Sequence, residues 1–289
     1  TWANEKKRTQ DPFGKPEKGA NPKPRPALWR LAGSWKIPQE NAREWFCRLP
    51  FEEVSRAMAS GPRAYFLGEG RDIFEVDAQE VDNFAKNLGT HADRLALAQG
   101  HWKSDQEGKA LLAVGSDDAI KVWVNGKVVA SEWAERKVTS YEDLFPIDVK
   151  KGENEIHVAV VNFKGPWGFF LNLPDEQTKA ELLAEAVSKG DYGRVQTLLA
   201  AGANLRQPVF RQLPALELAQ VMKRTHVEEL LRSFGAKESW LAWSHYPLLI
   251  RTLGPWFLPK IRKNPGYGFL IARGGKVLFE HYSGLANIE

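Results

Sequence analysis

The residue types that most often carry catalysis are present in this chain, but the common catalytic spacings are not. None of the twelve serines has a lysine at the third following position, so no lysine lies one helical turn from a potential serine nucleophile. The Gly-x-Ser-x-Gly and His-Glu-x-x-His patterns are also absent. The six histidines, at positions 91, 101, 157, 226, 245 and 281, lack metal-ligand spacing. We therefore expect no catalytic residue, no metal and no cofactor within this chain.

Two further groups favour a structural explanation. Cys47 is the only cysteine, so it forms no intramolecular disulfide, and no partner histidine can be assigned to it. It lies in an apolar run, and we expect it to be buried. Glu52 and Glu53 fit the solvated face of a helix better than a catalytic pair.

Composition and charge indicate a folded, multidomain chain with a basic arm. The 289 residues are 43% hydrophobic, which predicts two or three domains with real cores. The formal net charge is +4, and residues 1–26 hold seven basic residues against three acidic ones. Since the remainder is formally neutral, the charge does not favour a nucleic-acid partner for the folded body. We interpret residues 1–26 as a Pro/Gly-rich solvated arm or linker, with contact to an acidic surface as the alternative.

The ends of the chain and its longest apolar stretch bear on targeting. The sequence starts at Thr1 without an apolar signal segment, so we expect a processed product or a piece of something longer. Residues 240–259 are mostly apolar, but they carry His245 and Arg251, and Pro247, Gly254 and Pro255 interrupt them. A spanning helix needs about 20 mostly apolar residues without such breaks. We interpret residues 238–263 as a connector and expect no membrane span.

Residues 27–174 carry the signals of an antiparallel β-sandwich. Short alternating or continuously apolar runs recur at 94–98, 110–114, 120–124, 127–129, 145–149, 156–161 and 167–171. Asn125-Gly126 stands between two of these runs and predicts a tight hairpin, because both turn residues need positive φ. Regular short strands of this kind are typical of a sandwich. Residues 27–91 are less regular: Trp29 and Trp35 suggest further strands, and 77–88 suggests a helix.

Part of this region resembles a known family. GSDDAIKVWVNGKVV, followed by FPIDVKKGENEIHVAVVNFKGPWGFFLNL, is similar to the galactose-binding-like jelly rolls attached to many secreted bacterial glycosidases and hydrolases. The matching positions are Asp117, Asp118, Val122, Trp123, Asn125, Gly126, Gly152, Asn154, Trp167 and Phe169. The resemblance covers about 80 residues and implies a jelly-roll fold.

The resemblance also implies a carbohydrate site in the loops at one end of the sandwich. There, aromatic rings would stack on sugars, and carboxylates would accept hydrogen bonds from hydroxyls. The candidates are Asp117, Asp118, Trp102, Trp133 and Trp167. For Trp167 the alternative is a place in the core, and for the two aspartates a place in a turn. A calcium ion at the aspartates is a further alternative, although two adjacent acids are weak support for an ion that takes about six to eight oxygens.

Residues 177–237 contain a repeated helical pattern. Five positions recur after 33 residues, the ankyrin period: Leu183 and Leu216, Ala186 and Ala219, Leu198 and Leu231, Gly202 and Gly235, Ala203 and Ala236. The two segments resemble ankyrin repeats, the first more closely. Two repeats fall below the roughly three needed for independent stability, so we expect them to pack on a neighbour. Binding a protein partner and spacing two domains are the two functional alternatives.

Residues 264–289 predict a β-hairpin around a Gly-Gly turn. The pattern resembles the opening hairpin of β-lactamase-family serine hydrolases and related penicillin-binding proteins, at Pro265, Gly266, Gly275, Lys276, Gly284, Ala286 and Asn287. The resemblance implies acyl transfer on an amide or ester by the whole protein, through a serine in Ser-x-x-Lys. That motif would lie beyond Glu289, so we expect this chain by itself to be inactive.

Together these patterns predict a multidomain fold: an antiparallel β-sandwich (jelly roll), an α-helical ankyrin-like repeat pair and the first hairpin of an α+β serine hydrolase domain. We expect the chain to be the non-catalytic N-terminal region of a secreted or periplasmic bacterial hydrolase. It would bind a glycan, a cell-wall ligand or a protein, or it would present the enzyme to one of these. The alternative is a carbohydrate-binding or protein-interaction module with no hydrolase activity.

Overall fold

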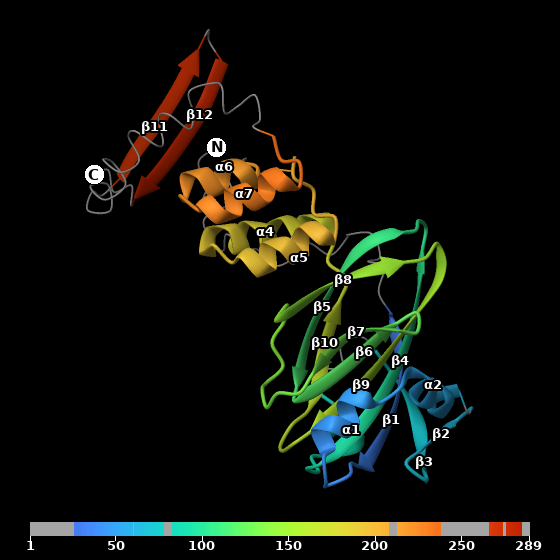
Figure 1. Cartoon of the computed structure of the whole chain (residues 1–289). Helices are drawn as coiled ribbons and strands as arrows, with labels where there is room; N and C mark the ends of the chain where they lie inside the picture. Colours follow the sequence, from blue (N-terminus) through green and yellow to red (C-terminus); the bar gives the residue numbers. More distant parts are fainter. Residues whose placement is uncertain are drawn as a thin grey trace, which may run out of the picture. The chain divides into compact units, whose positions relative to one another are not determined.

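A computed structural model describes residues 26–59, 61–77, 83–207, 213–237, 266–273 and 276–284 (Figure 1). The chain divides into two compact units, residues 1–175 and 176–289, which are treated separately below. Almost all of the expected basic arm, and the expected connector at 238–263, lie outside the described residues. Within the described part of the chain, no helix combines the length and apolarity needed to span a bilayer.

The described residues of the first unit form ten strands and three helices. The strands are β1 (Leu28–Lys36), β2 (Arg63–Phe66), β3 (Glu69–Asp77), β4 (Arg94–Ser104), β5 (Gly108–Asp117), β6 (Ala119–Val124), β7 (Lys127–Glu132), β8 (Asp143–Val149), β9 (Gly152–Asn162) and β10 (Gly168–Asn172). The helices are α1 (Ala42–Arg48), α2 (Phe51–Ala59) and α3 (Ala85–Leu88). Seven strands form a large antiparallel sheet in the order β2-β3-β1-β4-β9-β6-β7, and three form a small sheet in the order β10-β5-β8.

Local turn chemistry explains the hairpin between β6 and β7. Asn125 has φ 51° and Gly126 has φ 82°, as the type I′ turn requires, so the predicted Asn-Gly hairpin is confirmed. The longest pairing joins β4 to β9, from Arg94 opposite Asn162 to Ser104 opposite Gly152. These central strands hold the large sheet together.

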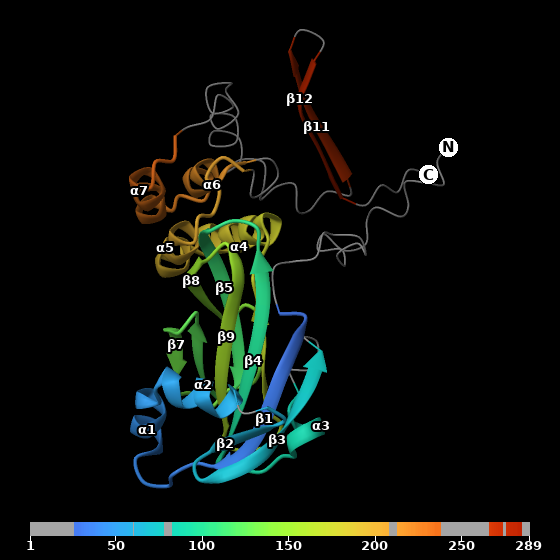
Figure 2. The same cartoon turned by 90° about the vertical axis from the view of Figure 1, so that its right-hand side faces the viewer.

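The large sheet is buried on both faces, which accounts for its continuous apolar runs. On one face it packs against the small sheet, with Trp29 from β1 meeting Phe169 from β10 edge-on at 5.1 Å between ring centroids. On the other face α1 and α2 cover it with side chains that include Phe46 and Met58 (Figure 2). A strand between two apolar layers has no solvent face, so its sequence does not alternate.

The jelly-roll part of the predicted fold class was wrong. A jelly roll divides eight strands between two sheets, whereas this unit has sheets of seven and three strands and a layer of helices. Helix α1 was missed because it is only seven residues long, too short to show a clear period, whereas α2 was expected only through a solvated helical face at Glu52 and Glu53. The helix expected over 77–88 is represented in the described residues only by α3.

The expected burial of Cys47 was also wrong. Cys47 is exposed on α1, while its neighbour Phe46 is fully buried against the large sheet. Successive residues of a helix point about 100° apart, so a short surface helix buries one and exposes the next. Glu52 and Glu53 lie on the exposed side of α2, as expected.

The second unit contains four helices in its described residues: α4 (Glu176–Lys189), α5 (Tyr192–Ala200), α6 (Ala215–Val221) and α7 (Thr225–Ser233). They form two helix pairs, α4 with α5 and α6 with α7, and the pairs stack on each other with α4 against α6 and α5 against α7. The predicted ankyrin-like repeats were wrong, because the described residues between α5 and α6 form no β-hairpin. Any two similar helix pairs can share the same spacing of leucine, alanine and a glycine at the helix end. The 33-residue spacing therefore indicated a repeated helix pair but not an ankyrin fold.

The C-terminal pairing matches the predicted hairpin. Strands β11 (Gly266–Arg273) and β12 (Lys276–Gly284) are antiparallel, with Gly266 opposite Gly284. The expected Gly-Gly turn lies outside the described residues. That this hairpin begins a hydrolase domain stays a prediction.

The buried His157 on β9 should make the first unit sensitive to acid. Its side chain is 1% exposed, and Phe51 from α2 meets its ring edge-on at 5.2 Å. Burial lowers its pKa from 6.5 to about 4, against the opposing pull of Glu155, whose carboxylate lies 3.0 Å away. The unfolded chain therefore takes up this proton first as the pH falls.

As the pH falls from 6.5 to about 4, we expect His157 to lower the free energy of unfolding progressively, by about 3 kcal/mol at the acid end. Thermal unfolding across this window should show a shallower loss in His157→Phe than in the unchanged protein. His91→Phe is the control, because His91 is exposed in the same unit and is not among the groups that shift the pKa of His157. An unchanged acid slope in His157→Phe would contradict this account.

Candidate functional site: a cationic groove on the large sheet

The five candidate residues from the sequence do not form one sugar-binding surface. Trp102 and Trp167 are 5% and 1% exposed and lie in the core between the sheets. Trp133 is partly buried, with its ring 5.4 Å from that of Phe46 and 4.8 Å from that of Phe163. Because a sugar must reach the face of a ring to stack on it, the burial of Trp102 and Trp167 does not fit a stacking role.

The two aspartates differ in exposure and in partners. Asp118 is 2% exposed, and its carboxylate accepts hydrogen bonds from the backbone N–H groups of Arg136 (3.0 Å) and Phe163 (2.7 Å). Asp117 is partly exposed, and burial together with the charge of Asp118 raises its pKa to about 6. Within the described residues, no group of three or more His, Cys, Asp or Glu side chains is placed to hold a metal ion.

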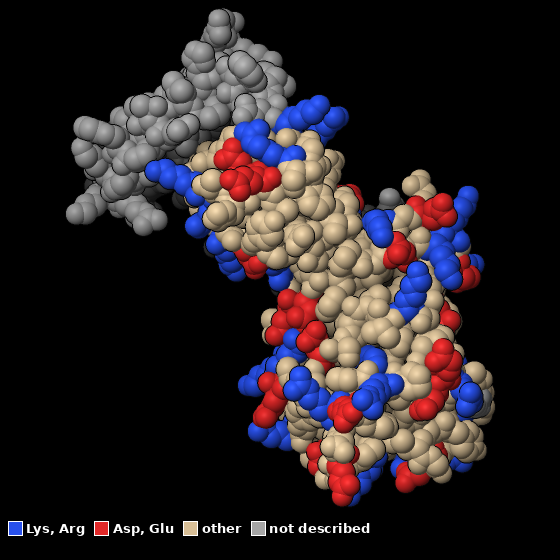
Figure 3. Space-filling model, in the orientation of Figure 1, with Lys and Arg blue, Asp and Glu red and all other residues tan. Residues whose placement is uncertain are grey.

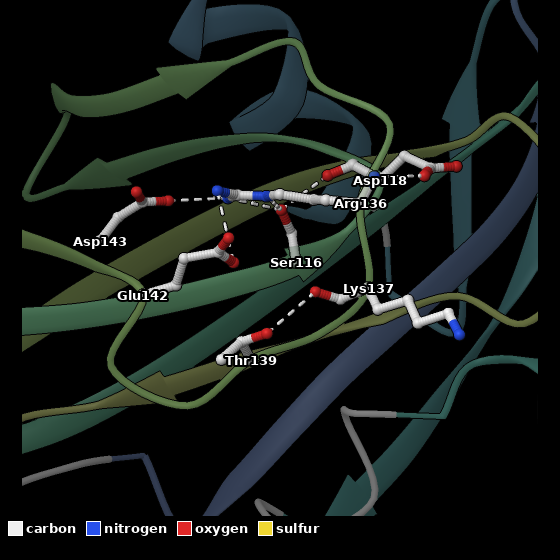
Figure 4. Close-up of polar contacts among 7 residues, drawn as sticks. All are labelled: Ser116, Asp118, Arg136, Lys137, Thr139, Glu142 and Asp143. Carbon is white, nitrogen blue, oxygen red and sulfur yellow. Dashed lines mark hydrogen bonds and ion pairs between the residues drawn. The ribbon is translucent and has the colours of Figure 1, made fainter.

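Asp118 belongs to a cluster of hydrogen bonds and ion pairs that holds the 133–142 segment onto β5 (Figure 4). The Arg136 guanidinium donates to Ser116 Oγ at 2.9 Å and to Asp143 at 2.7 Å, and lies 3.4 Å from Glu142. The Ser116 hydroxyl in turn donates to the backbone carbonyl of Asp118 at 2.6 Å. With the Arg136 side chain only 16% exposed, this cluster has a structural role.

A groove of about 380 Å³ lies elsewhere on the first unit, beside α3. Its lining residues are Gly33, Ser34, Arg71, Asp72, Phe74, Asn87, Leu88, His91 and Arg94. The groove forms where the cover over the large sheet ends: on β3, Val76 is 4% exposed, but Phe74, two residues away on the same face, is 40% exposed. Its volume is within the range of ordinary ligand pockets.

A bulge shapes one wall of the groove. The register between β1 and β4 shifts between Gly33 and Trp35, so Ser34 has no partner on β4. The Arg71 side chain donates from Nε to the freed Ser34 carbonyl at 3.1 Å. Trp35 Nε1 donates to the carbonyl of Glu69 at 3.0 Å on the neighbouring strand. Bulges often re-aim side chains next to binding sites, and this one is fixed by two long-range hydrogen bonds.

Buried side chains hold the other wall. Trp167 Nε1 donates to the carbonyl of Gly89 at 2.7 Å, and Asn162 Nδ2 donates to the carbonyl of His91 at 2.9 Å. Both donors belong to fully buried residues, so the segment that carries His91 rests on the rigid core. Trp167 is therefore a positioning residue for the groove.

The charges in the groove do not cancel. Arg71 is paired with Glu69, and Asp72 lies 3.2 Å from Arg63. No carboxylate among the described residues forms an ion pair with Arg94. On the face drawn in Figure 3, Lys and Arg are interspersed with Asp and Glu, without one large field of either sign. The groove is thus a local cationic site.

Sequence reasoning missed this site because its residues are dispersed. They come from 33–34, 71–74 and 87–94, and no motif spans them. The available signals were indirect: a strand with an irregular pattern near Gly33, and two arginines at strand positions.

Comparisons with known proteins leave the chain without a family. No family model matches the sequence, and no curated protein matches it. Among solved structures, it is similar to an anti-sigma factor domain-containing protein from Clostridium clariflavum, with 14% identity, TM-score 0.26, and 30% of this chain and 29% of that chain covered. It is also similar to the PA14 domain of the antifreeze protein MpAFP, with 14% identity, TM-score 0.32, and 55% and 87% covered.

A third similar structure is the GH31 α-xylosidase from Xanthomonas citri, with 16% identity, TM-score 0.23, and 27% of this chain and 9% of that chain covered. The matches thus span less than a third of the anti-sigma factor protein and less than a tenth of the xylosidase. With TM-scores this low, these likenesses assign neither a fold nor a function to this chain.

Trp167→Phe should loosen the groove wall. The substitution keeps an aromatic ring in the core but removes the hydrogen bond to Gly89, so we expect a loss of about 2 kcal/mol in the free energy of unfolding. Hydrogen exchange at residues 89–91 should become faster. Trp102→Phe is a matched control, since Trp102 Nε1 is buried without a hydrogen-bond partner in the described structure. Equal exchange at 89–91 in both variants would argue against a positioning role.

Proposed function

We propose that the first unit is a non-catalytic carbohydrate-binding module and that the groove beside α3 is its site. The observation that carries the proposal is a groove of about 380 Å³ with walls held by buried donors. Its lining offers the exposed ring of Phe74 for stacking on a sugar, and the amide of Asn87 and the hydroxyl of Ser34 for hydrogen bonds. Aromatic and polar groups in one preformed concavity are typical of small-ligand sites.

Binding fits the groove better than catalysis. Although Ser34 and His91 both line it, no hydrogen bond joins these two described residues, so the lining holds no serine activated by a base. The candidates predicted at Trp102 and Trp167 contribute to the core and the groove wall instead of to a rim.

The proposal is tested by titrating the full chain with a panel of neutral and acidic oligosaccharides in a calorimeter. At least one should bind, and Phe74→Ala should weaken that binding about tenfold or more. Tyr65→Ala is the control, because Tyr65 is an exposed aromatic on β2 that does not line the groove. An absence of binding across the panel at millimolar sugar, or equal loss in both variants, would overturn the proposal.

We also propose that the module serves a secreted or periplasmic bacterial serine hydrolase of the β-lactamase family. The support is the sequence pattern of residues 264–289, with which the antiparallel pairing of β11 and β12 is compatible. The encoded sequence after Glu289 tests this directly. A Ser-x-x-Lys motif is expected within about 60 residues, and its absence would overturn the hydrolase relationship.

A further inference from the structure

Arg94 places a positive charge at the boundary between the buried core and the groove. It is the first residue of β4, opposite Lys36 on β1 and Asn162 on β9. By strand alternation it lies on the same face as Ala96, which is fully buried, yet Arg94 itself is only partly buried. Its guanidinium carries five donors, and no carboxylate of the described residues forms an ion pair with it.

His91 adds a second nitrogen donor or acceptor to the same lining. Its carbonyl is held by Asn162, and its ring lies against Gly89, where a Cβ would come within 3.2 Å of Nε2. Gly89 has φ +72°, a conformation that glycine adopts without strain. The backbone under the imidazole is therefore fixed while the ring itself remains exposed.

The one acidic residue of the lining does not neutralise these groups. The Asp72 carboxylate is directed to Arg63, at 3.2 Å, and Arg71 is paired with Glu69. A ligand that brings its own carboxylate would supply the missing partner of Arg94. A planar carboxylate matches the guanidinium fork, and two such hydrogen bonds also fix the orientation of the ligand.

We infer that the groove selects a carboxylated sugar, a uronic acid unit of a glycan, over its neutral counterpart. The carboxylate would bind Arg94 beside His91, while the sugar ring would lie against Phe74. Inorganic phosphate has the negative charge but no sugar ring to pack against Phe74, so it should bind more weakly than a uronic acid. This inference rests on the proposed function of the same groove and narrows its ligand class.

The test compares matched ligands on the full chain by calorimetry. Trimers that contain galacturonate, mannuronate or glucuronate are each titrated beside their methyl esters, and inorganic phosphate is titrated alone. At least one acid trimer should bind tenfold or more tightly than its ester. Arg94→Gln should abolish that preference and leave the affinity for the ester within about twofold. Arg94→Lys, which keeps the charge but loses the fork, should retain only part of the preference.

Arg43→Gln is the matched charge control, because Arg43 is exposed on α1 and lies outside the groove lining. It should leave the acid preference unchanged, and equal loss in Arg43→Gln would overturn the inference. If Arg94→Gln fails to fold, Arg94→Lys still decides the point, since full retention of the preference would contradict a guanidinium fork.

The outcomes separate the inference from the function on which it rests. Acid and ester trimers that bind equally, with both weakened by Phe74→Ala, would overturn the acidic preference and leave the carbohydrate module standing. Phosphate that binds as tightly as the best acid trimer would also overturn it, as a general anion site. If no trimer binds in either form, the acidic preference fails, and the carbohydrate module fails as well only if the neutral oligosaccharides of the wider panel also do not bind.

Discussion

Replacing Lys121 with methionine is expected to lower the free energy of unfolding of the first unit by about 3 kcal/mol. Lys121 lies on β6, is 3% exposed, and points its ammonium group at the end of α1. It donates to the carbonyls of Cys47 at 2.5 Å and Leu49 at 2.9 Å, and lies 3.5 Å from that of Phe46. These carbonyls end a helix, where a positive charge is favoured.

Methionine has a similar length and can fill the same space, but it has no donor for these carbonyls. Burial lowers the pKa of Lys121, so the charged side chain also has a desolvation cost, which the substitution would relieve. The lost hydrogen bonds should outweigh this relief because the buried carbonyl of Leu49 and the partly buried carbonyl of Cys47 would both lose this donor.

Denaturant unfolding measures the effect, with Lys127→Met as the control. Lys127 is exposed on β7, six residues away along the same hairpin, and its replacement should change stability by less than about 0.5 kcal/mol. If Lys121→Met were as stable as the unchanged protein, water would have to satisfy the end of α1, and the role assigned to Lys121 would be wrong.

Gly115→Ala is expected to destabilise the first unit by a comparable amount, about 3 kcal/mol, and to release the 133–142 segment. A Cβ on Gly115 would lie 1.9 Å from the carbonyl oxygen of Thr139 and 2.9 Å from its carbonyl carbon. Both are backbone atoms, so relief requires the whole segment to move. That movement would pull Arg136 away from Ser116 and Asp143, to which it now donates.

Hydrogen exchange across residues 133–142 should accelerate in Gly115→Ala, and denaturant unfolding should show the lost stability. Gly193→Ala is the control glycine: it lies in α5, and a Cβ there would meet only Asp191 Oδ1, at 3.9 Å. Alanine favours a helix more than glycine does, so this change should be neutral or slightly stabilising. Unaltered exchange in Gly115→Ala would mean that the segment is not held by its close approach to β5.

The parts of the fold that could be predicted from the sequence are those that depend on interactions between residues close together in the chain. The β6–β7 hairpin was readable because Asn125 and Gly126 alone determine the turn. Helix α1 was not readable, because its apolar residues are few and their role depends on packing against the large sheet. The 33-residue spacing correctly predicted a repeated helix pair but wrongly predicted the ankyrin fold. Helix pairs end in similar caps in many folds, so the caps do not identify the fold.

The candidate site shows the same limit more sharply. Trp167 stood out in the sequence, but its burial makes it a support for Gly89 and not a sugar platform. Asp118 stood out as well, yet both of its carboxylate oxygens are used to anchor backbone N–H groups. Arg94, in contrast, carried no local signal.

The sequence by itself located the strands β4 to β10 and the Asn125-Gly126 turn, and it showed that the charge excess belongs to residues 1–26 and that the common catalytic spacings are absent. These properties depend on neighbours a few residues apart, which a linear pattern records. Only the tertiary structure decided that both faces of the large sheet are covered, that Lys121 caps α1, and that Phe74, His91 and Arg94 share one groove. Such placements arise from strand order and layer packing, which join residues that no local period connects.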